Sequence, residues 1–132
     1  MQDRPTAWEL LDAVAELLEE TIMPATEGGV RHQARVAANL CRIVQRELET
    51  GVQADRREAE LLAAVLGGDA GADREPLGEA HELSQELHRR LLDGEDESLE
   101  AAAWPALLEI VRAKLAIAKP GYDTYDYSGE DR

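Results

Sequence analysis

Phenylalanine is absent from this 132-residue sequence, and the aromatic residues are limited to two tryptophans and three tyrosines. Most of the apolar residues are alanine and leucine, and no segment alternates apolar with polar residues as a half-buried strand does. Alanine and leucine lose little side-chain freedom in a helix, whereas strands favour β-branched and aromatic residues. The composition therefore predicts an all-α protein.

Cysteine occurs once, at Cys41, which excludes a disulfide framework and a zinc site built from several thiolates. Cys41 falls within the apolar stripe of a predicted helix. A thiol in apolar surroundings keeps a high pKa and reacts slowly, so we expect a core residue rather than a catalytic nucleophile.

Positive charge is scarce, with 14 cationic against 28 acidic side chains and a formal net charge of −14. Nucleic acids and anionic membranes would be repelled by most of such a surface. No apolar segment approaches the ~20 residues that a membrane-spanning helix needs, and the N-terminal residues lack the pattern of a secretory leader. We expect a cytoplasmic protein that binds neither nucleic acid nor membrane.

Catalytic and cofactor-binding motifs are also missing from the sequence. His81, Gln85 and His88 share one helix face, but two histidines seven residues apart without a third ligand do not make a zinc motif. The glycine pairs at 28–29 and 67–68 lack the preceding strand that a phosphate-binding loop requires. We therefore expect no metal, no cofactor and no enzymatic activity.

The clearest helix is predicted over 30–48. One apolar stripe on it comprises Val30, Ala34, Ala37, Cys41, Val44 and Leu48, and Val36, Leu40 and Ile43 form a second stripe beside the first. This apolar arc is wider than a surface helix needs. We expect this helix to end near Thr50 and Gly51, because glycine commonly ends helices.

Three further main helices and one short helix are predicted by capping signals and apolar spacing. The first covers 7–23, where Thr6 and Glu9 have capping-box spacing and Pro24 stops the helix. Its predicted buried residues are Trp8, Leu11, Ala15, Leu18 and Ile22, with Leu10, Val14 and Leu17 beside them. A short helix covers 55–66, after a start signal at Asp55 and Glu58, and a loop follows it. The next main helix starts at Pro76 and ends at Gly94.

The last main helix is predicted over 104–119, because Pro105 fits poorly inside a helix. A short helical turn ending at Ala103 precedes it, with Ser98 as its cap. The predicted buried residues of this last helix are Trp104, Leu108, Val111, Leu115 and Ala118. The expected architecture is thus an antiparallel bundle of four main helices plus a short helix over 1–119, with an acidic tail over 120–132. The favoured interpretation of the tail is that Tyr122 folds back on the bundle, and the alternatives are a partner-docking peptide and a disordered tail.

One edge of helix 30–48 is basic, and it carries Arg31, Arg35, Asn39 and Arg42, with Arg46 beyond them. The favoured interpretation is a charge zipper with the first helix, in which Glu9 meets Arg42, Asp12 meets Asn39 and Glu16 meets Arg35. The alternative is an anion site, in which Arg31, Arg35, Asn39 and Arg42 bind a phosphate or carboxylate near the helix N-terminus.

Three segments resemble a small bacterial family known as a domain of unknown function: QDRPTAWELLDAVAELLEE, GVRHQARVAANLCRIVQREL and RAKLAIAKPGYD. His32 and Gln33 depart from the family pattern, in which an aromatic residue is usual. Members of this family are often encoded beside acyl-CoA dehydrogenase-like and aminoglycoside phosphotransferase-like proteins. The resemblance implies an accessory role in acyl-CoA or related small-molecule metabolism, and it brings no catalytic residues.

Two functional hypotheses follow from these observations. The first is a non-catalytic accessory protein that binds another enzyme, such as an acyl-CoA dehydrogenase-like or phosphotransferase-like protein. The second is a binding module for a phosphate or acyl-CoA anion at the basic edge. The wide apolar arcs of helices 30–48 and 104–119 also suggest a homodimer.

Overall fold

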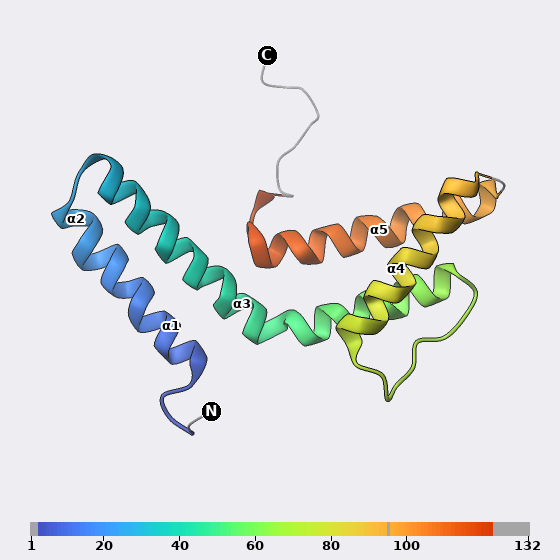
Figure 1. Cartoon of the computed structure of the whole chain (residues 1–132), viewed down its shortest axis with the longest axis horizontal. Helices are drawn as coiled ribbons and strands as arrows, with labels where there is room; N and C mark the ends of the chain where they lie inside the picture. The colour runs from blue at the N-terminus through green and yellow to red at the C-terminus, as the bar shows by residue number, and fades with distance from the viewer. Residues whose placement is uncertain (1–2, 95, 123–132) are drawn as a thin grey trace, which may run out of the picture. The chain divides into compact units, whose positions relative to one another are not determined.

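A computed structural model describes residues 3–94 and 96–122, and all regular structure in these ranges is helical (Figure 1). The all-α prediction is confirmed. The chain forms two compact units, one up to Thr50 and one from Gly51. No helix within the described ranges is both long enough and apolar enough to span a bilayer.

The first unit is a helical hairpin. Helix α1 (Ala7–Glu16) continues into a wider π-helical segment, η1 (Leu17–Ile22), and a last turn, α2 (Met23–Ala25). The predicted capping box is confirmed: the Thr6 side chain accepts a hydrogen bond from the Glu9 amide, and the Glu9 carboxylate accepts one from the Thr6 amide. Pro24 lies within the last turn and does not stop the helix before it. In an α-helix, the proline ring would clash with the backbone carbonyl group four residues earlier. The turns of η1 are wider than α-helical turns, so the ring fits there.

Helix α3 (Gly28–Val65) contributes to both units and contradicts the predicted boundary at Thr50 and Gly51. The helix passes through both residues, so the separate short helix over 55–66 is the end of α3. A glycine inside a helix costs only about 1 kcal/mol relative to alanine, which burial along a long amphipathic helix outweighs. Gly51 is itself buried.

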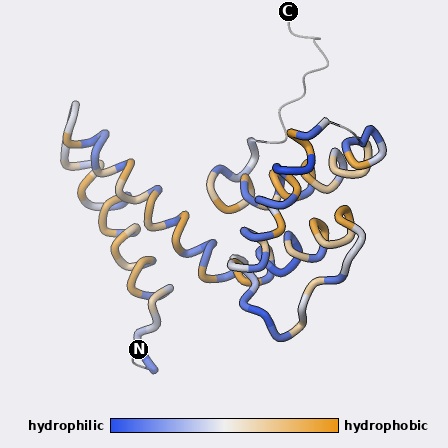
Figure 2. Tube along the Cα trace, turned by 45° about the vertical axis from the view of Figure 1, so that its right-hand side comes forward, coloured by the Kyte–Doolittle hydropathy of each residue, from blue (hydrophilic) through white to orange (hydrophobic). Residues whose placement is uncertain are grey.

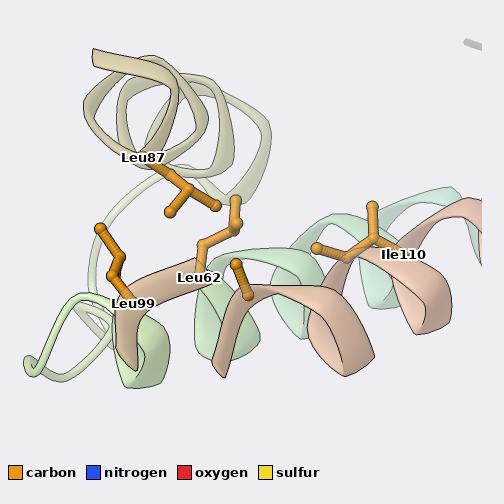
Figure 3. Packing of buried hydrophobic residues seen from close by; sticks show 5 residues of the cluster. Leu62, Leu87, Leu99 and Ile110 are labelled. Carbon is orange, nitrogen blue, oxygen red and sulfur yellow. The ribbon is translucent and has the colours of Figure 1, made fainter. Parts of the chain in front are cut away.

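The second unit combines the end of α3 with α4 (Pro76–Asp93) and α5 (Glu97–Ala118). Helix α5 runs antiparallel to this part of α3 (Figure 1), and ion pairs join Arg57 to Glu109 and Glu58 to Lys114. The core contains one side chain from α3, one from α4 and three from α5 (Figure 3): Leu62, Leu87, Leu99, Ala103 and Ile110. These contacts hold the three helices of the second unit together.

Both ends of α4 follow the sequence prediction. Pro76 occupies the first turn, where its missing amide hydrogen is no loss, and Glu75 caps the amides of Leu77 and Gly78. Gly94 ends the helix in the left-handed conformation, with φ of 66°.

Helix α5 corrects the sequence prediction in two ways. It begins at Glu97 rather than Trp104 and includes Pro105, and its cap is Asp96 rather than Ser98. Pro105 is exposed, so water can satisfy the carbonyl group that lacks its helical partner. The buried side is also different from the predicted one: it consists of Leu99, Ala103, Ala106 and Ile110, whereas Trp104, Leu108 and Val111 are exposed.

The end of the described chain places Tyr122 against Lys119. The Lys119 ammonium lies 4.6 Å from the centre of the tyrosine ring, and the side chain is half exposed. The predicted contact of Tyr122 with the bundle is thus a local contact at the end of α5. Tyr125 and Tyr127 lie outside the described residues.

Candidate functional site

The basic edge of α3 meets the acidic side of α1 through Arg42. Its guanidinium donates to Asp12 at 2.5 Å and to Glu19 at 2.9 Å, and its side chain is mostly buried. These hydrogen bonds lower the pKa of both Asp12 and Glu19 below their ordinary values. The same contacts raise the pKa of Arg42, so the cluster is fully charged near neutral pH.

Gln45 completes this cluster and is only 4% exposed. Its amide nitrogen donates to the Trp8 carbonyl oxygen and to Asp12, and its amide oxygen accepts from Arg42. A buried amide with both ends satisfied stabilises one particular alignment of two helices. The sequence analysis missed Gln45, although its spacing from Ala34, Ala38 and Cys41 places it on the buried face of α3.

The charge zipper forms in a different register from the predicted one. Arg42 contacts Asp12 and Glu19, whereas Glu9 bonds to Arg4 and Thr6. The predicted pairs of Glu9 with Arg42, Asp12 with Asn39 and Glu16 with Arg35 do not form. The connection between the helices is centred between Thr26 and Glu27, so the numbers of level residues add to about 53 or 54 instead of the predicted 51, a shift of two or three residues.

The remaining residues of the predicted anion site are exposed and separate from this cluster. Arg31, Arg35 and Asn39 form no ion pair or side-chain hydrogen bond with any part of the chain that the structure describes. Arg31 and Arg35 are one helical turn apart and therefore lie on the same side of α3. The structure thus divides the four residues: Arg42 is engaged with carboxylates, and the other three face solvent.

A pocket of about 340 Å³ lies in the second unit, between the end of α3, the following loop and the start of α4. Glu79 is 5% exposed at its base and accepts a hydrogen bond from the Gly71 amide at 2.7 Å. Arg74 approaches Glu79 and also bonds to Glu82. These contacts hold the loop against α4.

The charges around this pocket do not favour an anion. Arg74 is already engaged with carboxylates, and the carboxylates of Glu60 and Asp69 line the pocket together with Arg56. The described residues contain no group of three or more side chains suited to bind a metal ion. His81 bonds to Gln85, and His88 is exposed. The glycine pair at 67–68 ends α3 and enters the loop that borders this pocket.

Exposed apolar side chains are the most prominent remaining surface feature. Figure 2 shows hydrophobic residues recurring along both helices of the hairpin. In the second unit, Trp104, Leu108 and Val111 lie on one side of α5, and Trp104 is 71% exposed. We call these three residues the α5 stripe.

Comparisons with known proteins identify the family of this chain. No curated protein and no solved structure matches this chain. A family model described as a domain of unknown function, DUF6285, matches residues 24–122, a region that contains all of α3, α4 and α5. The chain therefore belongs to the DUF6285 family of domains of unknown function.

Proposed function

We propose that this protein is a non-catalytic accessory protein that binds an enzyme of acyl-CoA or related small-molecule metabolism through the α5 stripe. The observation that carries the proposal is the exposure of Trp104 beside Leu108 and Val111. Large aromatic residues dominate the energetics of protein interfaces, and contiguous exposed apolar residues commonly mark interaction sites. The class of enzyme is suggested by the resemblance described above, in which acyl-CoA dehydrogenase-like and phosphotransferase-like proteins are encoded nearby.

Co-expression with an acyl-CoA dehydrogenase-like enzyme and with a phosphotransferase-like enzyme from the same source, followed by purification and native mass spectrometry, tests the proposal. We expect a complex of fixed stoichiometry with one of them, which Trp104→Glu removes because it places a charge in the apolar contact. Leu92→Glu is the matched control, since Leu92 is 72% exposed on α4 and outside the stripe.

Two results would contradict the proposal. Failure of both enzymes to bind removes the proposed partners, and equal binding by the Trp104→Glu chain removes the α5 stripe as the contact. Turnover of a substrate by the isolated chain would instead overturn its non-catalytic character.

A second candidate function is anion binding at Arg31 and Arg35. In its favour, these two arginines are exposed and unpaired within the described ranges of a chain whose net charge is −14. Their guanidinium groups, one turn apart, could bind a phosphate group of a coenzyme A ester. Asn39 lies one turn further along α3 and could add an amide donor.

Thermal unfolding with inorganic phosphate, coenzyme A and acetyl-CoA tests this second candidate. We expect at least one of these three ligands to raise the melting temperature of the wild-type chain. The same ligand should not raise the melting temperature of the Arg35→Ala chain. Arg112→Ala is the control, because Arg112 is an exposed arginine on α5. The absence of a rise with all three ligands would exclude this function.

A further inference from the structure

The hairpin of the first unit buries small side chains and exposes larger ones. Its buried apolar residues are Ala15, Ala34 and Ala38, which allow α1 and α3 to approach closely. Six leucine and valine side chains on α1, at the start of η1 and on α3 are about half exposed: Leu10, Val14, Leu17, Val36, Leu40 and Val44. We call these six residues the hairpin face.

Helical geometry and the Arg42 contacts place all six residues on one side of the hairpin. At ~100° per residue, Leu10, Val14 and Leu17 lie about a third of the way around the helix axis from the buried side that contains Ala15. Asp12 and Glu19 lie on the other flank of that buried side. On α3, Arg42 lies on one side of the buried alanines, and Val36, Leu40 and Val44 lie on the other side. Because Arg42 contacts Asp12 and Glu19, the charged flanks of both helices share one side. The apolar flanks must therefore share the other.

The two helices also align these residues in pairs. Gln45 bonds to the Trp8 carbonyl oxygen, so residues whose numbers add to about 53 or 54 lie level with one another. Leu10 is then level with Val44, Val14 with Leu40, and Leu17 with Val36. Each level of the hairpin face thus carries one leucine and one valine, and the leucine alternates between the two helices.

We propose that the hairpin face binds the same face of a second copy of this chain and forms a four-helix bundle with a two-fold axis parallel to the helices. This axis places α1 of each copy against α3 of the other at the same level. Every leucine then meets a valine of the other copy, which is the alternation of large and small side chains that packs well. Neighbouring helices are antiparallel throughout, as in ordinary four-helix bundles.

The extent of the surface is sufficient for a specific dimer. The hairpin face lies within the length over which α3 runs beside the first helix, from Gly28 to about Arg46, which is about 27 Å at 1.5 Å per residue, and two adjacent helices are roughly 20 Å wide. Two copies would bury about 1,100 Å² in total, which is at the lower end of specific interfaces. The charged cluster lies on the opposite side of the hairpin, so it does not bring like charges together in the contact.

Analytical ultracentrifugation of the full chain in about 150 mM salt, up to on the order of 100 μM, tests the proposal. We expect a species of twice the 14.5 kDa chain mass. Val14→Glu should shift it to the monomer, because the charge would enter the centre of the contact. Glu16→Lys also changes the charge of an exposed residue of α1, but it lies on the charged flank beside Asp12 and Glu19, so it should leave the dimer intact. A monomeric wild-type chain, or equal dimerisation of the Val14→Glu chain, would overturn the proposal.

Disulfide cross-linking tests the symmetry even if Val14→Glu unfolds the hairpin. In a Cys41→Ser background, a chain with Val14→Cys mixed with a chain with Leu40→Cys should form a mixed disulfide dimer faster than either chain forms one alone. Faster self-linking of the Val14→Cys chain would indicate a two-fold axis perpendicular to the helices and would overturn the proposed arrangement. This test does not depend on the α5 stripe, so it succeeds or fails separately from the proposed enzyme contact.

Discussion

At the scale of single residues, Gln45 and Arg42 determine how α1 aligns with α3. The fully buried apolar residues between these helices are alanines, which pack closely but hardly distinguish one register from another. The buried amide of Gln45 and the guanidinium of Arg42 are directional, and they have partners at only one alignment. Register in this hairpin thus depends more on two polar side chains than on apolar packing.

Gln45→Ala should lower the free energy of unfolding by about 1–3 kcal/mol, because it removes the hydrogen bonds that the buried Gln45 amide makes with the Trp8 carbonyl oxygen, Asp12 and Arg42. Urea unfolding followed by circular dichroism measures this change. Gln53→Ala is the control, since Gln53 is an exposed glutamine of the same helix and should change stability little. Equal effects of the two substitutions would contradict the role of Gln45.

The Arg42 cluster should make the hairpin sensitive to acid. Hydrogen bonds from Arg42 lower the pKa of Asp12 and Glu19 in the folded state, so both carboxylates bind protons more weakly when folded than when unfolded. Their contribution to stability is therefore complete above the ordinary carboxyl pKa of about 4 and is lost as the pH falls below that value.

Urea unfolding midpoints between pH 7 and pH 3 test this expectation when the wild type is compared with Arg42→Ala. The difference in midpoint between the two chains should be constant above about pH 5 and should shrink toward pH 3. The comparison removes the effects of the other carboxylates, which both chains share. A difference that stays constant down to pH 3 would show that the cluster does not stabilise the hairpin.

At the scale of elements, the caps of the helices follow local rules and their lengths do not. Thr6, Pro76 and Gly94 occupy the ends that their chemistry favours. Gly51 and Pro105 lie inside helices, although each would disfavour an isolated helix at that point. The difference is that a cap is decided by the few neighbouring backbone groups, whereas continuation through a poor residue depends on the tertiary contacts of the whole helix.

Gly94→Ala should destabilise the second unit by about 1 kcal/mol, because a β-carbon is unfavourable at the positive φ that ends α4. A β-carbon at this position would meet no atom within 4 Å, so the effect isolates the backbone conformation. Thermal or urea unfolding measures the change. Gly68→Ala is the matched control, since its φ is outside the left-handed region and its β-carbon would only touch the Ala63 carbonyl at 4.0 Å.

At the scale of the whole molecule, the net charge of −14 opposes both folding and self-association. Ion pairs along α4, such as those of Glu86 with Arg89 and Arg90, offset part of the repulsion and lower the pKa of Glu86 to about 2. Such exposed pairs contribute little individually. The excess of acidic residues should therefore govern how the protein responds to salt.

Raising sodium chloride from about 10 mM to about 150 mM should increase the melting temperature, because it shortens the screening length from about 30 Å to about 8 Å. It should also strengthen the proposed dimer for the same reason. Calorimetry or circular dichroism at the two salt concentrations measures the first effect, and sedimentation measures the second. A fall in melting temperature would show that attractive ion pairs outweigh the repulsion.

The sequence by itself determined the helical class, the capping box at Thr6, both ends of α4 and the antiparallel hairpin, because propensity, capping and short connections act over a few residues. Only the tertiary structure decided which part of each wide apolar arc is buried. On α3, Ala34 and Ala38 are buried, whereas Val44 and Leu48 are exposed. On α5, Ala103 and Ala106 are buried, whereas Trp104 and Leu108 are exposed. Small side chains are buried in both helices because they let the helices approach closely. It also decided that Arg42 binds Asp12 and Glu19 while Arg31 and Arg35 face solvent, since the register of two helices depends on contacts between residues about 30 positions apart.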